Sequence, residues 1–580
     1  MAGETIDLEY IISPDNMAVQ IAEQWREWSV KRSEKVEEWK ELRNYLYATD
    51  TRTTKNAMLP WSNSTTTPKL TQIMDNLHAN YFATLFPQNI WFRFEAKSSD
   101  DNVKVKREAV QSYMENKIKQ SNFVNTASDL LYDYIQYGNC FATVTWEENY
   151  QEKEDENLVV NYIGPRVVRI SPFDICFNPT ASTFQKSPKI IRSIKTLGEI
   201  KKMIEEDPTK EYMKAVFDKM MGARAAVKSS ETQHKADGFI ADGFTSIEQY
   251  YESNYVEVLT FYGDFYDEEK DKLHEDRIIT IVDRAYVLAN EENPSYLGHS
   301  PIYHAGWRPR PDNLYAMGPL DNLVGMQYRI DHLENLKADV FDQIAYPILK
   351  IRGDVEDFDF SPATRIYMGE EGDVGYLAPD STALNADFQI QALENKMEEM
   401  AGAPRQAMGI RTAGEKTAFE VQTLQNAASR IFEHKTAHFE RVFLEPILNA
   451  MFEVSRRRMN VSDTIRVFDT PTNAVIFRTI TKDDITASGK IVPVGARHFA
   501  ERARRVQSLT QLYQIKLSDP TVAAHMSGKE FARILAEELG EPTLFSENIM
   551  VQEQLETQQE VQEAEMQNEE MLVQKQELGM

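Results

Sequence analysis

Two apolar stripes with the period of an α-helix flank a segment that lacks this period, and this order constrains the fold more than any other feature. The stripes consist of Leu323, Met326, Ile330, Leu333, Leu336, Val340 and Ile344, ending before Pro347, and of Ile390, Leu393, Met397 and Met400. Residues 348–379 between them are rich in Gly and Asp, with short runs typical of strands (ILKIRG, TRIYMG, VGYLAP). The sequence therefore predicts two helices that flank a small β-type insert.

The first half of the chain mixes both periods. Helices are expected at residues 21–46 as one long amphipathic helix, and at 70–85, 103–118, 125–137 (ended by Gly138-Asn139) and 197–206. Strands are expected at 140–146, 158–170 and 175–177, with turns at Gly164-Pro165 and Asn178-Pro179, and at 247–266, 277–288 and 301–307. The polar, Pro-broken residues 51–68 predict a long exposed loop.

The second half returns to helices after a Gly-broken stretch at residues 402–414. Residues 416–459 predict one long helix, in which Pro446 marks a kink. Strands at 465–467, 475–480 and 490–493 and helices at 497–516 and 529–539 are expected to follow. The fold class predicted from these patterns is α+β.

The charge balance excludes one class of function. The 580 residues include 91 Asp and Glu against 64 Lys and Arg, a net charge of −27, and tight non-specific duplex binding requires the opposite sign. Ten acids and one lysine in residues 541–580 predict a helix that packs only in an oligomer. Two cysteines, no apolar run of about 18–20 residues and an acidic N-terminal segment lead us to expect a soluble, non-secreted protein without membrane contact.

The nearest match to a nucleotide-binding motif is the segment from Gly409 to Thr417. A phosphate-binding loop needs Lys directly after the second Gly, but Glu415 stands between Gly414 and Lys416 and places a negative charge there. We therefore expect a flexible loop that leads into a helix.

Two further groups are weak metal-site candidates. His434 and His438 are four residues apart, but no third ligand accompanies them. The acids of residues 354–359 lack the spacing of a calcium loop. We expect no metal, no cofactor and no catalytic site, and hence no enzyme.

Five segments, in order, resemble the portal proteins, or head–tail connectors, of tailed bacteriophages, especially those of short-tailed phages. They are LYDYIQYGNCFATVTWEE (130–148), SPFDICFNPTA (171–181), GPLDNLVGMQYRIDHLENLKAD (318–339), GEKTAFEVQTLQNAASRIFEHKTAHFERVFLEPIL (414–448) and GKIVPVGARHFAERARRVQSLTQL (489–512).

The resemblance implies a portal fold that assembles as a cyclic ring, expected to be a dodecamer. It would comprise a mixed α/β wing (1–317 and the returning strands 460–496), a stem of two helices (318–346 and 384–401), a clip (347–383), a tunnel loop (402–415), a long kinked helix (416–459), a helical crown (497–540) and an acidic helical tail (541–580).

The function implied by the resemblance is a conduit at one capsid vertex of the virion, assembled in the host cytoplasm. Double-stranded DNA would enter through the channel during packaging and leave on ejection. The implied partners are the major capsid and scaffolding proteins, the terminase large subunit, which would hydrolyse ATP, and later the head–tail adaptor and tail proteins.

The resemblance places the candidate site residues in two segments. The tunnel-loop residues expected to face DNA are Arg405, Gln406, Met408, Arg411 and Lys416. The clip residues expected to bind motor and adaptor are Asp354, Asp357, Asp359, Tyr367, Glu370 and Glu371, within a rim of eight acids and three bases. Local ion pairs in the loop and a solvated hairpin in the clip are the alternative explanations. An ATP-driven DNA translocase and a structural virion ring that passes no DNA are the alternative functions.

Overall fold

The computed structural model describes residues 15–47, 63–87, 91–96, 101–152, 158–205, 211–227, 254–293, 300–358, 365–377, 381–401, 432, 434–459, 462–469, 474–486, 489–494 and 509. The chain divides into two compact units, one formed by residues 1–86 and 117–458 and the other by residues 87–116 and 459–580. Both helices and antiparallel sheets are present, so the predicted α+β class is confirmed.

The helix predicted over residues 21–46 is two helices, α2 (Asn16–Lys31) and α3 (Ser33–Leu46), and the prediction of a single helix was wrong. The break falls at Arg32, whose guanidinium is buried and donates hydrogen bonds to the carbonyls of Pro172 (2.8 Å), Phe173 (2.6 Å) and Ile175 (2.6 Å). A buried guanidinium needs acceptors, and these three carbonyls meet that need. Residues 171–176 (SPFDIC) thus supply the backbone acceptors that hold the Arg32 side chain.

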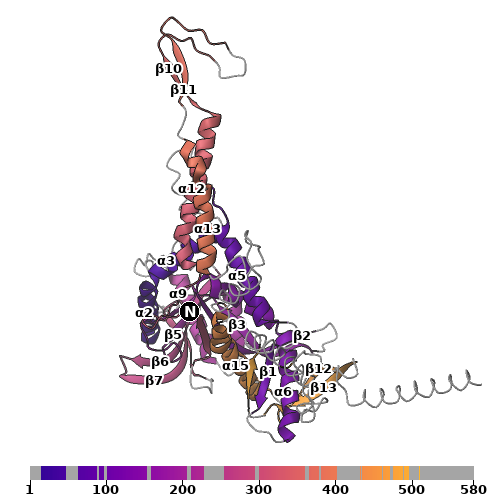
Figure 1. Cartoon of the computed structure of the whole chain (residues 1–580). Coiled ribbons are helices and arrows are strands. Elements are labelled where there is room, and N and C mark those ends of the chain that lie inside the picture. Colours follow the sequence, from indigo (N-terminus) through magenta and orange to yellow (C-terminus); the bar gives the residue numbers. More distant parts are fainter. Residues whose placement is uncertain are drawn as a thin grey trace, which may run out of the picture. The chain divides into compact units, whose positions relative to one another are not determined.

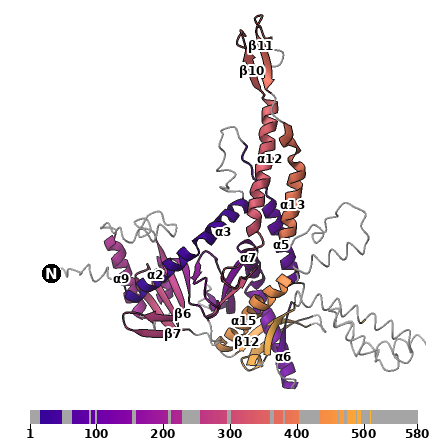
Figure 2. The ribbon, with the colours of Figure 1, turned by 60° about the vertical axis from the view of Figure 1, so that its left-hand side comes forward.

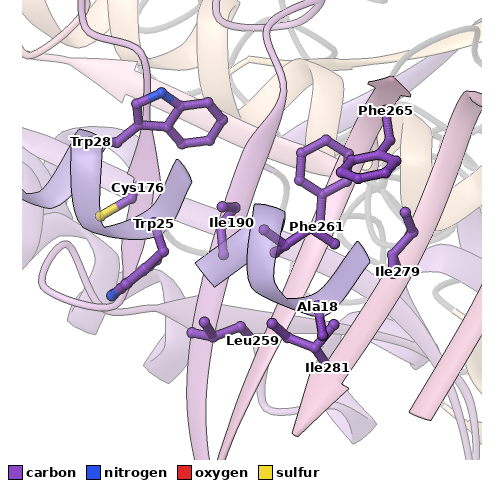
Figure 3. Packing of buried hydrophobic residues seen from close by; sticks show 11 residues of the cluster. Ala18, Trp25, Trp28, Cys176, Ile190, Leu259, Phe261, Phe265, Ile279 and Ile281 are labelled. Atoms are coloured by element: carbon purple, nitrogen blue, oxygen red, sulfur yellow. The ribbon is translucent and has the colours of Figure 1, made fainter. Parts of the chain in front are cut away.

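A five-stranded antiparallel sheet lies beneath α2. Its order is β4 (Ile175–Phe177), β5 (Lys189–Thr196), β6 (Tyr255–Asp267), β7 (Lys272–Val282) and β8 (Tyr286–Glu292). Ala18, Trp25 and Trp28 of α2 pack on one face of the sheet, as Figure 3 shows. Helices α8 (Leu197–Glu205) and α9 (Glu211–Val227) cover Val256 and Val258 on the other face. Sequence analysis missed α9.

A three-stranded sheet forms a second layer of the first unit, in the order β3 (Leu158–Ile170), β2 (Asn139–Glu152), β9 (Ile302–Gly306). The turn predicted at Gly164-Pro165 was wrong, because both residues pair with β2 inside β3. Among the described strands β3 is an edge of this sheet, where a proline without an N–H is tolerated. The helices α5 (Lys69–Leu85) and α7 (Phe123–Gln136) belong to the same unit, and Gly138 ends α7 at φ +67°, as expected.

The two predicted helices and their insert are confirmed. α12 (Val324–Ala345) leads to the hairpin of β10 (Ile348–Arg352) and β11 (Asp373–Leu377), and α13 (Asp387–Ala401) returns beside α12. Figures 1 and 2 show the paired helices with the hairpin beyond their far end.

The long helix predicted at 416–459 is described only from Phe432. Residues 434–439 are α-helical, Glu440–Leu444 form one π-helical turn, and α15 (Glu445–Arg458) follows. The regular α-helix is therefore interrupted one turn before Pro446, whose lack of an N–H removes a helical hydrogen bond.

The described residues of the second unit form two strand pairs. β1 (Phe92–Ala96), which sequence analysis missed, pairs with β14 (Gly489–Pro493), and β12 (Ser462–Asp469) pairs with β13 (Ala474–Thr481). The helix α6 (Asp101–Gln120) begins here, and its Gln111 joins it to β1 through bonds to Phe94 N (3.0 Å) and Phe92 O (3.1 Å). Apart from residue 509, the predicted crown and acidic tail lie outside the described residues.

Candidate functional site

The α12–α13 pair and its hairpin form the candidate site of the first unit. Burial along α12 falls from its start to its end: Gln327, Ile330 and Asp331 are fully buried, whereas residues 341–346 are all exposed. Lys337 of α12 forms an ion pair with Asp387 at the start of α13, about midway along α12. The near end of the pair is anchored in the unit, and the far end presents its side chains to solvent.

A ladder of hydrogen bonds anchors α12 to the extended residues 63–67. Side-chain oxygens spaced four residues apart on the helix accept the N–H groups of every second residue from 63 to 67, and then that of Leu70 in the first turn of α5. These bonds are Asp339 with Asn63 (2.6 Å), Asn335 with Thr65 (3.0 Å), Asp331 with Thr67 (2.9 Å) and Gln327 with Leu70 (3.2 Å). Four helical residues rise about 6 Å and two extended residues about 6.6 Å, so the two repeats match.

The ladder also binds carbonyl groups. Asn335 Nδ2 donates to Thr65 O (2.9 Å), and Gln327 Nε2 donates to Thr67 O (2.6 Å). The two side-chain amides therefore accept from and donate to the backbone of this segment, as an adjacent β-strand would. Residues 63–68 form neither helix nor strand, as expected of a loop, but within residues 63–67 only Thr65 is exposed, because α12 supplies the partners that their backbone needs.

An ion pair fixes α13 in the same region. Lys69 Nζ lies 2.7 Å from Glu398 Oε1, and the two side chains are only 7% and 4% exposed. Lys69 also contacts Gln72 Oε1 at 3.1 Å. The near ends of both helices are thus held by buried polar contacts.

The far end of the helix pair, next to the hairpin, is exposed and apolar. Large apolar side chains are exposed along the end of α12, the hairpin and the start of α13: Phe341, Ile344, Tyr346, Ile348, Ile351, Ile366, Tyr367, Met368, Tyr376, Leu377 and Phe388. The register pairs Ile348 with Leu377 on one face and Ile351 with Val374 on the other, so each face of the hairpin carries an apolar pair. Apolar surface gathered in this way typically marks an interaction site.

The residues predicted to belong to a clip lie among these apolar side chains. Asp354, Asp357, Tyr367, Glu370 and Glu371 are all exposed, Tyr367 to 65%. The backbone joins the two arms beyond the strands, through Gly369 N to Asp354 O (2.9 Å) and Glu356 N to Tyr367 O (3.2 Å). Asp354 and Glu371 are thus brought to one end of the hairpin, while Asp359 lies outside the described residues.

The predicted tunnel-loop residues fall between residues 401 and 432, a stretch that lies outside the described residues. This applies to Arg405, Gln406, Met408, Arg411 and Lys416, and to the nucleotide-like segment 409–417. His434 and His438 are described, and the described residues include no group of three or more ligands that could hold a metal ion.

Sequence analysis missed a cavity of about 500 Å³ in the first unit. β2, β6 and β9 contribute Trp146, Tyr262 and Tyr303, and α15 contributes Glu453 and Arg457, which form an ion pair of 2.7 Å. Glu453 is the one carboxylate among the described residues of its lining, and it is paired with Arg457.

A scan against protein-family models and a search of curated proteins both find no match to this chain. Among the described helices, none has both the length and the apolar character needed to cross a bilayer.

Proposed function

We propose that this chain is the subunit of a portal ring, a closed cyclic assembly at one capsid vertex that conducts double-stranded DNA. In this proposal α12 and α13 are the stem, and the β10–β11 hairpin is part of the clip. The proposal rests on the sequence resemblance and on one structural observation, the exposed apolar hairpin at the end of the helix pair.

The hairpin is the feature that needs a partner. A two-stranded hairpin is marginally stable in water by itself, and this one has apolar side chains on both faces. Within the described residues no further strand pairs with β10 or β11. Copies of the chain around a rotation axis would cover these faces with one another, since head-to-tail contacts close into rings.

The net charge of the chain favours DNA that slides through the ring over DNA that binds tightly to it. A net charge of −27 repels phosphates over roughly one Debye length, about 8 Å at physiological salt. DNA would therefore slide through the ring, while the terminase large subunit supplies ATP hydrolysis. The exposed acids of the hairpin would contact that motor first and the head–tail adaptor later.

Native mass spectrometry with negative-stain imaging tests the assembly. Twelve subunits of 66.8 kDa predict a ring with a central hole near 800 kDa. Rings with a nearby subunit count would also support a closed conduit. A stable monomer of 66.8 kDa that never forms rings would contradict it.

Packaging assays separate the portal from the alternatives. The portal hypothesis predicts that Arg405→Gln with Arg411→Gln leaves rings intact but lowers the amount of packaged DNA. A structural ring that passes no DNA predicts no change. A translocase predicts ATP hydrolysis by the isolated protein, abolished by Lys416→Ala.

A further inference from the structure

Positively charged and imidazole side chains gather where residues 434–441 cross the end of β9. Lys435 Nζ donates a hydrogen bond to Trp307 O (2.5 Å), and the ring of His438 is hydrogen-bonded to the backbone of Gly306. Residues 434–441 are thereby joined to Gly306, the last residue of β9, and to Trp307, which follows it.

Trp307 connects the helix to a further cation. Lys435 Nζ lies 4.4 Å and the Arg308 guanidinium 5.2 Å from the centre of the indole ring, both within cation–π range. The indole is 3% exposed and its N–H donates to the Tyr81 hydroxyl (3.1 Å). A fixed, buried ring thus holds two cations near each other.

The helix extends this group along one face. His434, His438 and Arg441 are spaced by four and three residues, which places their side chains on the same side of a helix. Arg308, His434 and Arg441 are exposed, whereas Lys435 and His438 are half-buried. We call Arg308, His434, Lys435, His438 and Arg441 the cationic cluster.

Among the residues that the structure describes, members of the cationic cluster form none of the carboxylate pairs that other arginines of this unit form. Arg310 pairs with Asp312 at 2.7 Å, and Arg166 pairs with Glu147 at 2.6 Å. Within the described residues none of the five cluster members forms an ion pair with a carboxylate.

The electrostatic surroundings agree with this geometry. Burial and then Arg308 lower the pKa of Lys435. Burial and then Lys435, Arg441 and His434 lower the pKa of His438. A lowered pKa favours the neutral imidazole of His438, so the permanent positive charges of the cluster are the guanidinium groups of Arg308 and Arg441.

We propose that the cationic cluster contacts the phosphate backbone of double-stranded DNA. This inference rests on the proposed function, which brings DNA to the protein. Phosphate contacts need positive side chains and carry no sequence information, which suits DNA of any sequence. The guanidinium groups of Arg308 and Arg441 can each donate two hydrogen bonds to one phosphate. A few such contacts in an acidic chain give weak, salt-sensitive binding that permits movement.

The full-length protein and a fluorescent 30-base-pair duplex provide the test. Binding is measured by anisotropy over a range of salt concentrations for the wild type and the variant R308Q/R441Q. Each phosphate contact contributes about 0.9 to the slope of log affinity against log salt, so the double variant should lose about 2 from that slope. R166Q/R310Q is the control, because it removes the same charge from two arginines with carboxylate partners.

The outcomes separate this inference from the proposed function. Equal slopes for R308Q/R441Q and R166Q/R310Q would overturn the cluster inference, while rings seen by imaging would leave the portal proposal standing. A reduced slope only in R308Q/R441Q supports the cluster, whether or not the protein forms rings. If polyglutamate of equal charge displaces the duplex as well as unlabelled duplex does, the ligand is an acidic protein surface and the DNA assignment is wrong.

Discussion

Lys69 and Glu398 are 329 positions apart in the sequence, yet their side chains form an ion pair of 2.7 Å that is almost completely excluded from solvent. The pair connects the start of α5 to the near end of α13. A buried ion pair gains little net stability over apolar residues, but removing one partner leaves an uncompensated charge. The contact therefore acts mainly to specify where α13 lies.

Lys69→Met should lower the free energy of unfolding of the first unit by roughly 3–5 kcal/mol, because Glu398 would remain buried without its main counter-charge. The double variant K69M/E398L should recover most of this loss. Urea unfolding monitored by circular dichroism, with hydrogen exchange of α13, provides the measurement. A double variant no more stable than K69M would show that the two side chains are not coupled.

Asp331→Ala should loosen the ladder between α12 and residues 63–67. It removes the acceptor of Thr67 N–H and of Gln327 Nε2, and each unsatisfied buried group costs about 1–3 kcal/mol. Asp331→Asn keeps one carbonyl oxygen and should cost less. Hydrogen exchange at Thr65 and Thr67 should accelerate in the alanine variant, and unchanged protection there would refute the bracing role of the ladder.

Lys189 should make stability rise with pH. Burial lowers the pKa of this lysine from its ordinary value of 10.5 to about 7. Its Nζ lies near Gln185 O (3.2 Å), Ser187 O (2.8 Å) and Ser300 Oγ (2.8 Å). A neutral amine can donate one hydrogen bond to each carbonyl and accept one from the serine hydroxyl. The charged form is thus the one that the fold disfavours.

The sign follows from proton counts. Between pH 7 and 10.5 the unfolded chain binds a proton at Lys189 that the folded chain does not, so stability increases there by up to about 1.4 kcal/mol per pH unit. Below pH 7 the penalty is constant and at its largest. Lys189→Met should remove this slope between pH 7 and 9, measured as the difference in unfolding free energy from wild type. Parallel pH profiles for the two proteins would contradict a neutral Lys189.

Leu377→Asp should weaken ring assembly if the hairpin faces contact neighbouring copies. A charge on this face would replace burial of a leucine worth about 1.5–3 kcal/mol, at least a tenfold loss in association per contact. Leu273→Asp is the matched control, because both leucines lie in strands and their exposures are 57% and 55%. Native mass spectrometry should show fewer rings for L377D only, whereas equal losses would indicate a general effect of the charge.

Elements that depend on neighbouring residues could be predicted from the order of the amino acids alone. The apolar period predicted α12 and α13, the change to strand-like runs predicted the hairpin between them, and Gly138 predicted the end of α7. Local periodicity is set by contacts within a few residues, so it is visible in one sequence. The exposed acids Asp354, Glu370 and Glu371 were assigned to the clip by resemblance, and the hairpin brings Asp354 and Glu371 to one end.

Contacts between groups far apart in the chain could not be predicted and became visible in the folded structure. Nothing in the pattern of residues 21–46 indicates that Arg32 interrupts the helix, because its acceptors lie about 140 positions away in the chain. The same holds for the ladder of Asp331 with Thr67 and for the cations around Trp307. A buried polar group must find partners, but which partners it finds depends on the path of the whole chain, and that path is fixed by packing between elements.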